Sequence, residues 1–297
     1  MTDLTTVQAP ILAPSGRLGR VHVFNLARPD VDVRAPLAAL ASALDHGRAL
    51  VGLGAPLCLR FDRAWPWLRP FPALSGPGCA VVSTQGALVC LLFGDDRGEL
   101  VHQTRALSST LGPAFVLAEL IDTFIYRDSR DLTGYVDGTE NPKDERAIAA
   151  AVVADRGPGL DGGSMLALQR WVHDLDAFEC FGHAQRDALM GRSLETNEEL
   201  ADAPPSAHVK RAAQESFEPE AFMVRRSMPY TSGTENGLCF LAFGESVDRY
   251  ERVLRRMLGL EDGIVDGLFA FSRAASGGYY FCPPLAAGRL DLRALGL

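Results

Sequence analysis

The sequence lacks the features that mark exported, membrane-spanning or nucleic-acid-binding proteins. No stretch approaches 18 uninterrupted apolar residues, so no membrane span is predicted. The segment Met1–Arg20 has neither a basic stretch followed by an apolar core nor paired arginines, which argues against an export signal. With 37 acidic and 29 basic residues, the net charge is −8, and this charge disfavours nucleic acid and anionic membranes as partners.

The usual signatures of a metal site built from protein ligands are also missing. The six cysteines form no C-x-x-C pair, and the six histidines show no H-E-x-x-H or other paired spacing. A cysteine metal centre and a zinc hydrolase are therefore not expected. Several cysteines lie in apolar, strand-like runs, where a reduced thiol behaves as a small hydrophobe, and this pattern favours a reducing, cytoplasmic location.

The composition predicts a folded protein with a substantial core. The 297 residues are 47% hydrophobic and 22% charged, which suggests one large domain or two of ordinary size. Alternating apolar residues predict strands at 19–26, 165–172, 221–230 and 237–244, and a hairpin from the runs 79–84 and 87–94. Helical spacing predicts helices at 33–50, 98–125 (broken near Gly112–Pro113), 174–181 and 246–259, and residues 184–218 read as a polar loop.

The order of these elements repeats. The segments ALVCLLFGD (87–95) and GLCFLAFGE (237–245) align without gaps and occupy corresponding places in the two halves. The sequence therefore predicts an α+β fold of two ferredoxin-like halves, residues 1–145 and 146–297, with antiparallel sheets that pack face to face or close into a barrel.

Two polar motifs interrupt this pattern. In DLTGYVDGTENPK (131–143), Asp137 stands between glycines, which allow close backbone approach to a flat ligand; a turn or a helix start explains the same residues. In AFMVRRSMPY (221–230), Arg225 and Arg226 interrupt a strand and point to opposite faces, so one can face water and the other a pocket. A structural salt bridge is the alternative for the arginines.

Three more residues are candidates with ordinary alternatives. His208, in PPSAHVKR, is a possible ligand or a solvated loop histidine. Asp266 is a possible site residue or a helix N-cap, and Arg192 is a possible site residue or a loop cation. Chemistry alone decides none of these cases.

Taken together, the motifs resemble the dye-decolourising peroxidase family of haem peroxidases, which have two ferredoxin-like halves. The resemblance starts with SRDLTGYVDGTENP (129–142) and continues in the family's order through WVHDLDAF, AHVKR, VRRSMPY, GLCFLAF and SGGYYFCPP. It covers most residues from about 120 onward, whereas the first hundred match in predicted architecture alone. The short N-terminus is similar to that of the bacterial, cytoplasmic (B-type-like) branch.

The resemblance implies a role for each candidate. His208 matches the proximal histidine that binds the iron of haem b, Asp266 the acid bonded to that histidine, Asp137 the distal carboxylate and Arg225 the distal arginine. Further cofactor contacts are implied at Gly138, Thr139, Glu140, Arg192, Leu238 and Phe240. Ser227 stands where some relatives carry asparagine, which leaves the turnover rate open.

The implied function is a haem-dependent peroxidase that reduces hydrogen peroxide and oxidises aromatic, dye-like donors in one-electron steps. Two other hypotheses stay open: a haem-binding, transport or iron-handling protein with weak peroxidase activity, and a ferredoxin-like binding module without haem. The resemblance favours a homo-oligomer. No extended tail follows SGGYYFCPP, so a role as encapsulin cargo is not expected.

Overall fold

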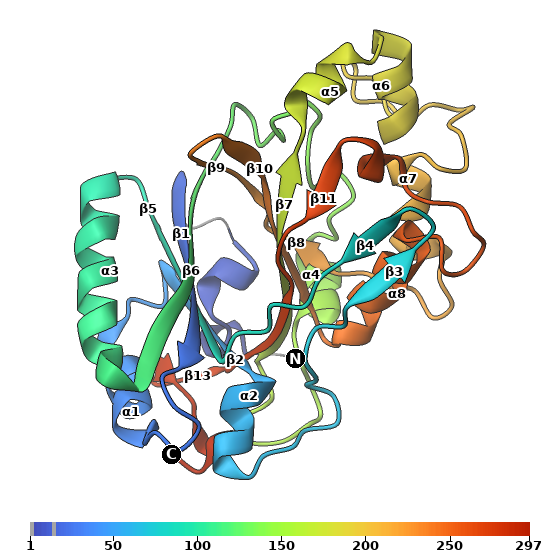
Figure 1. Cartoon of the computed structure of the whole chain (residues 1–297). Helices are drawn as coiled ribbons and strands as arrows, with labels where there is room; N and C mark the ends of the chain where they lie inside the picture. Colours follow the sequence, from blue (N-terminus) through green and yellow to red (C-terminus); the bar gives the residue numbers. More distant parts are fainter. Residues whose placement is uncertain (1–2, 14–15) are drawn as a thin grey trace.

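The computed structural model describes residues 3–13 and 16–297, and its main feature is an antiparallel sheet that closes on itself (Figure 1). Within these residues, the largest sheet has the strand order β11-β7-β12-β2-β5-β1-β6-β9-β10-β8, and β10 also pairs with β7. Because β7 and β10 pair, the strands from β7 round to β10 form a barrel. The predicted mixture of α and β structure with antiparallel strands is confirmed.

The first part of the chain contributes four barrel strands. Its main elements are β1 (Leu18–Leu26), α1 (Arg34–Ala43), β2 (Ala49–Gly54), α2 (Ala55–Cys58), β5 (Leu88–Gly94), α3 (Arg97–Leu111) and β6 (Phe115–Phe124). The strand predicted at 19–26 is present, and α1 is shorter than the helix predicted at 33–50. Asp96 begins α3 because its side chain accepts a hydrogen bond from the backbone N–H of Glu99 at 2.9 Å.

Two predictions in this part are wrong. The runs 79–84 and 87–94 do not form a hairpin: β4 (Cys79–Val81) pairs with β3 (Leu74–Gly76), whereas β5 pairs with β1 and β2. Residues 98–125 are not one broken helix, since the helix ends at Leu111 and residues 115–124 are strand β6. Gly112, with φ +53°, and Pro113 end the helix, and pairing with β1 then outweighs the helical spacing that follows.

The second part of the chain contributes the other four barrel strands. Its main elements are α4 (Asp144–Ala151), β7 (Ser164–His173), α5 (Leu175–Cys180), β9 (Met228–Ser232), β10 (Glu235–Gly244), α8 (Val247–Met257), β11 (Ser272–Ala274), β12 (Gly278–Cys282), β13 (Leu285–Ala286) and β14 (Arg289–Leu290). The predicted caps of the helix at 246–259 are present. The Ser246 side chain accepts from the backbone N–H of Asp248 at 3.1 Å, and Gly259 has φ +68°.

Two further segments differ from the prediction. Residues 184–218 are not a continuous loop, because they include most of α6 (His183–Met190) and all of α7 (His208–Arg211). The strand predicted at 221–230 is split into β8 (Val224–Arg225) and β9, with Arg226 and Ser227 between them. The Arg226 side chain leaves the sheet and donates hydrogen bonds to the backbone carbonyls of Ile11 and Leu12.

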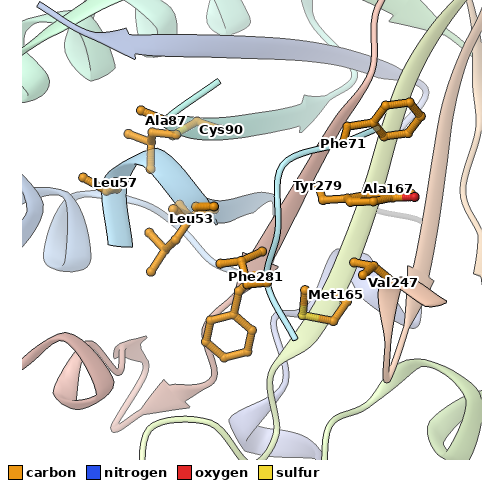
Figure 2. Close-up of a cluster of buried hydrophobic side chains, with 14 of the residues drawn as sticks. Leu53, Leu57, Phe71, Ala87, Cys90, Met165, Ala167, Val247, Tyr279 and Phe281 are labelled. Atoms are coloured by element: carbon orange, nitrogen blue, oxygen red, sulfur yellow. The ribbon is translucent and has the colours of Figure 1, made fainter. Parts of the chain in front are cut away.

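Alternation along the strands divides the core into two clusters. On β12, Tyr280 and Cys282 join a cluster with residues from every barrel strand, while Tyr279 and Phe281 join the cluster between the barrel and its helices (Figure 2). In Figure 1, α1 and α3 lie on one side of the barrel, and α6, α7 and α8 on the other. Within the described residues, no helix is both long and apolar enough to cross a membrane.

The barrel has a weakly paired seam between β6 and β9. The backbone pairing there is Thr123 with Tyr230. Arg170 of β7 reinforces the seam, because its guanidinium contacts Glu119 of β6 at 2.7 Å, the Tyr230 hydroxyl at 3.2 Å and Glu235 of β10 at 2.7 Å. Its side chain is 21% exposed, so these ion pairs are partly shielded from water.

Candidate active site

Five of the predicted site residues line one cavity, here called the main cavity. They are Asp137, His208, Arg225, Leu238 and Phe240. They come from the loop between β6 and α4, the start of α7, the end of β8, and β10. Three of them, Asp137, Arg225 and Leu238, also line a second cavity of about 220 Å³, the side cavity. The fold therefore brings together residues that are far apart in the sequence.

His208 is oriented by a buried carboxylate. Its Nδ1 lies 2.8 Å from Oδ2 of Asp266, whose side chain has no exposed surface. The other oxygen of Asp266 accepts from the backbone N–H of Leu268 at 2.8 Å, so Asp266 is both an N-cap and the partner of His208. A carboxylate beside Nδ1 favours the tautomer with its proton on Nδ1, which leaves Nε2 as the nitrogen with a free lone pair.

Asp137 lies in a loop whose backbone is held locally. Its backbone N–H donates to the carbonyl of Ser129 at 3.2 Å, and its Oδ1 accepts from the backbone N–H of Gly138 at 2.7 Å. Gly138 has φ +74°, a left-handed conformation that favours glycine. The carboxylate is half-buried and lines both cavities, so it can exchange a proton with a small molecule held there.

Arg225 and Ser227 bring unsatisfied polar atoms to the same place. Within the part of the chain that the structure describes, Nε of Arg225 and Oγ of Ser227 are buried and have no hydrogen-bond partner, and both residues line the side cavity with Asp137. Neither Arg225 nor its neighbour Arg226 forms an ion pair within residues 3–13 and 16–297. Because burial without a partner costs about 1–3 kcal/mol per group, these atoms indicate a site for a polar ligand.

Four other predicted contacts lie away from the lining of the main cavity: Gly138 lines the side cavity, whereas Thr139, Glu140 and Arg192 line neither. Arg192 donates to Glu140 at 2.6 Å and to the carbonyl of Asn197 at 3.1 Å. Thr139 is exposed, and its hydroxyl lies 3.5 Å from Nδ2 of Asn197. Arg192 therefore makes the contacts of an ordinary loop cation, which was the alternative to a site role in the sequence analysis. Contacts of these residues with a cofactor remain predictions.

With this geometry in view, comparison with known proteins decides the family. Residues 128–287, more than half of the chain, match the family model described as Dyp-type peroxidase, C-terminal. The chain belongs to the Dyp-type peroxidase family. The resemblance seen in the motifs is thereby confirmed, and the chain is an enzyme of the peroxidase class.

Relatives and solved structures of the Dyp-type family agree over most of the chain. The dye-decolorizing peroxidase of Brevibacterium linens is 30% identical over 247 residues, which are 80% of this chain and 67% of that protein. A putative Dyp-type peroxidase from Shewanella oneidensis has a TM-score of 0.85 at 26% identity, covering 95% of this chain and 97% of that one. A variant of DypB from Rhodococcus jostii RHA1 in complex with heme has a TM-score of 0.79 at 29% identity, covering 92% and 94%.

The structure of this Dyp-type peroxidase adds candidate site residues that are not predicted from the sequence. His173 also lines the main cavity, with Nε2 3.1 Å from Oδ2 of Asp131 and Nδ1 2.7 Å from Oγ of Ser272. Burial would raise the pKa of Asp131, but hydrogen bonds from His173 and Thr133 lower it below the usual value. Asp131 is the first residue of the motif that also contains Asp137, and its place in that motif is the signal by which the sequence could have identified it.

Proposed function

We propose that this Dyp-type peroxidase uses haem b to reduce hydrogen peroxide and to oxidise aromatic, dye-like donors one electron at a time. The observation that carries the proposal is the composition of the main cavity. A histidine oriented by a buried carboxylate, His208 with Asp266, shares this cavity with an acid and a cation, Asp137 and Arg225. That set supplies a metal ligand, a proton carrier and a group that stabilises negative charge.

The residues of the main cavity fit a haem group. Its lining is mainly apolar, as a porphyrin face requires, and includes Trp171, Met190, Met223, Leu238, Phe240, Val253, Met257 and Leu268. His208 would bind the iron through Nε2, and Leu238 and Phe240 would contact the porphyrin. We also propose contacts from Gly138, Thr139, Glu140 and Arg192 at the rim. When bound, haem supplies the iron-centred redox chemistry of peroxide reduction and of one-electron donor oxidation.

The chain's own residues would then handle protons and charge. The Asp137 carboxylate would accept a proton from one oxygen of hydrogen peroxide and return it to the other, which would leave as water, while bound haem would supply the electrons for cleavage of the O–O bond. Arg225 stabilises the negative charge that develops on the departing oxygen; a donor of this kind contributes about 2.7–4 kcal/mol in other enzymes. Asp266 keeps the proton of His208 on Nδ1 and so keeps Nε2 available.

We further propose the organisation that the repeat suggests. Residues 1–145 and 146–297 would be two ferredoxin-like halves, supported by the order strand-helix-strand-strand-helix-strand of β1, α1, β2, β5, α3 and β6. In the second half, β7, α5, β9, β10, α8 and β12 follow the same order. A homo-oligomer that works in the cytoplasm completes the proposal.

An absorbance spectrum of the purified protein, supplied with haem and then with peroxide, tests the function. We expect a Soret band that changes on adding peroxide, and turnover of an aromatic donor. His208→Ala should lose the haem. Haem-loaded protein without donor turnover would contradict the proposal, and haem transfer or iron release faster than turnover would favour a carrier instead.

A further inference from the structure

We propose that Asn141 is a positioning residue that fixes the position of Asp137 relative to Arg225. The inference rests on the proposed function, since the proposed function assigns both residues their roles. Asn141 lies in the loop between β6 and α4, and its side-chain amide meets the backbone of Arg225 twice. Its Oδ1 accepts from the Arg225 N–H at 2.9 Å, and its Nδ2 donates to the Arg225 carbonyl at 2.8 Å.

The amide takes the place of a neighbouring strand. β8 stands at the end of the strand order and pairs with β10 over Val224 and Arg225. The next N–H, of Arg226, donates to Leu241 of β10 at 2.9 Å. Because backbone groups of successive strand residues point to opposite edges, the N–H and carbonyl of Arg225 face away from β10. Asn141 meets them on that edge, so the Arg225 backbone is held from both sides.

A tight turn ties the same amide to Asp137. The Asn141 N–H donates to the Gly138 carbonyl at 3.1 Å, and Gly138 directly follows Asp137. A larger residue at Gly138 would be strained, because φ there is +74° and an added Cβ would lie 3.0 Å from Nδ2 of Asn141. The loop that carries the acid is therefore attached to the strand that carries the cation through one side chain.

The contact needs a group that donates and accepts at once. An ionised aspartate at this position would accept from the Arg225 N–H, but its second oxygen would face the Arg225 carbonyl oxygen and repel it. A protonated aspartic acid has the shape of asparagine and also one donor and one acceptor. Asn141→Asp should therefore lose the contact at neutral pH and regain it in acid, which a merely space-filling residue would not do.

The experiment compares Asn141→Asp and Asn141→Ala with wild type, and Asn25→Asp serves as a control with the same chemical change on exposed β1 surface. In haem-free protein, hydrogen exchange of the Arg225 amide reports the contact directly. In haem-loaded protein, haem affinity and the stopped-flow rate with hydrogen peroxide are measured from about pH 4 to pH 8. The charged side chains that line the side cavity with Asn141 are Arg130, Asp137, Arg225 and Arg226. Asn141→Ala keeps all of these groups and adds no carboxyl group, so its pH profile shows the effect of their titration in the absence of the Asn141 contact.

We expect Asn141→Ala to exchange the Arg225 amide at least about tenfold faster and to react with peroxide up to about 100-fold more slowly, with haem affinity unchanged, because small misplacements of reacting groups have effects of this size. Asn141→Asp should match Asn141→Ala at pH 8. Its rate and its amide protection should rise toward wild type as the pH falls through the pKa of the new carboxyl group. Asn25→Asp should match wild type throughout.

The proposal is overturned if the Arg225 amide exchanges at the wild-type rate in Asn141→Ala, or if the Asp and Ala variants keep a constant rate ratio at every pH. A protein that fails to bind haem would refute the proposed function, and the exchange measurement on haem-free protein would still decide the role of Asn141. If Asn141→Ala does not fold, the pH dependence of amide exchange in Asn141→Asp decides it.

Discussion

Asp266 offers a test that separates stability of the fold from preparation of the iron ligand. One of its oxygens accepts from Nδ1–H of His208 and the other from the N–H of Leu268, each at 2.8 Å. Asp266→Asn keeps one oxygen for the Leu268 N–H, and the amide nitrogen that replaces the other oxygen then donates to Nδ1 of His208. The proton of His208 would move to Nε2, which would no longer offer iron a lone pair.

The expected magnitudes follow from these two hydrogen bonds. In haem-free protein, Asp266→Ala loses the cap, at about 1 kcal/mol, and the bond to His208, at about 1.5–3 kcal/mol, so unfolding should become easier by about 2.5–4 kcal/mol. Asp266→Asn keeps the cap and should lose about 1 kcal/mol. Haem affinity should fall about 10–100-fold in both variants, because both lose the group that fixes the tautomer.

Urea unfolding of haem-free protein and absorbance titration with haem measure the two effects. Asp174→Asn is a matched control, because Asp174 caps α5 by accepting from the Ala177 N–H at 2.9 Å and has no histidine partner. Its haem affinity should equal that of wild type. The reasoning is refuted if Asp266→Asn binds haem as tightly as wild type and with the same spectrum.

Three further predictions concern catalysis, the barrel seam and acid stability. Asp137→Asn should bind haem normally and react with peroxide about 10²–10⁴-fold more slowly in stopped-flow measurements; a rate equal to that of the exposed control Asp30→Asn would contradict its role. Arg170→Ala should lower the unfolding free energy by about 2–4 kcal/mol, which is the effect of breaking a buried ion pair reduced for partial exposure. The control is Arg97→Ala, which removes a side chain that is 78% exposed and should lower the unfolding free energy by about 0–1 kcal/mol. Equal urea unfolding curves for Arg170→Ala and Arg97→Ala would contradict the stabilising role of Arg170 at the seam. The lowered pKa of Asp131 stabilises the fold above the unfolded-state pKa of about 3.9, and this contribution is lost as the pH falls through the folded-state pKa. Asp131→Asn should therefore reduce the loss of unfolding free energy between about pH 6 and pH 2. An unchanged pH dependence would contradict a charged contact between Asp131 and His173.

The sequence predicts the elements whose local pattern and tertiary pairing agree. The strand at 165–172 and the helix capped by Ser246 are both present. The hairpin prediction fails because Gln85, which lies between the runs 79–84 and 87–94, makes long-range contacts. Its side chain accepts from the backbone N–H of Phe71 and of Tyr279 and donates to the Tyr279 carbonyl, so it fastens the segment to β12. The spacing of apolar residues along the chain does not reveal such long-range contacts.

The same limit applies to the site. The motifs identify the residues that the family resemblance names, and the fold places Asp137, His208 and Arg225 around one cavity. Two supporting contacts were not predictable: His173 with Asp131, 42 residues apart, and Asn141 with Arg225, 84 residues apart. A histidine at the end of a strand or an asparagine in a polar loop has many ordinary explanations, and the fold brings each one to its partner.

The broken strand at Arg226–Ser227 shows why a failed prediction can mark a functional site. β8 and β9 pair with β10 in one register on either side of the break, and among the described residues Nε of Arg225 and Oγ of Ser227 are buried there without hydrogen-bond partners. Each such atom costs about 1–3 kcal/mol, and both face one cavity with Asp137. Their cost is recovered if a small polar molecule binds there, which is what the proposed reaction requires of hydrogen peroxide. Under the proposed function, the side chains of Arg225 and Ser227 would supply hydrogen-bond donors to hydrogen peroxide in this cavity.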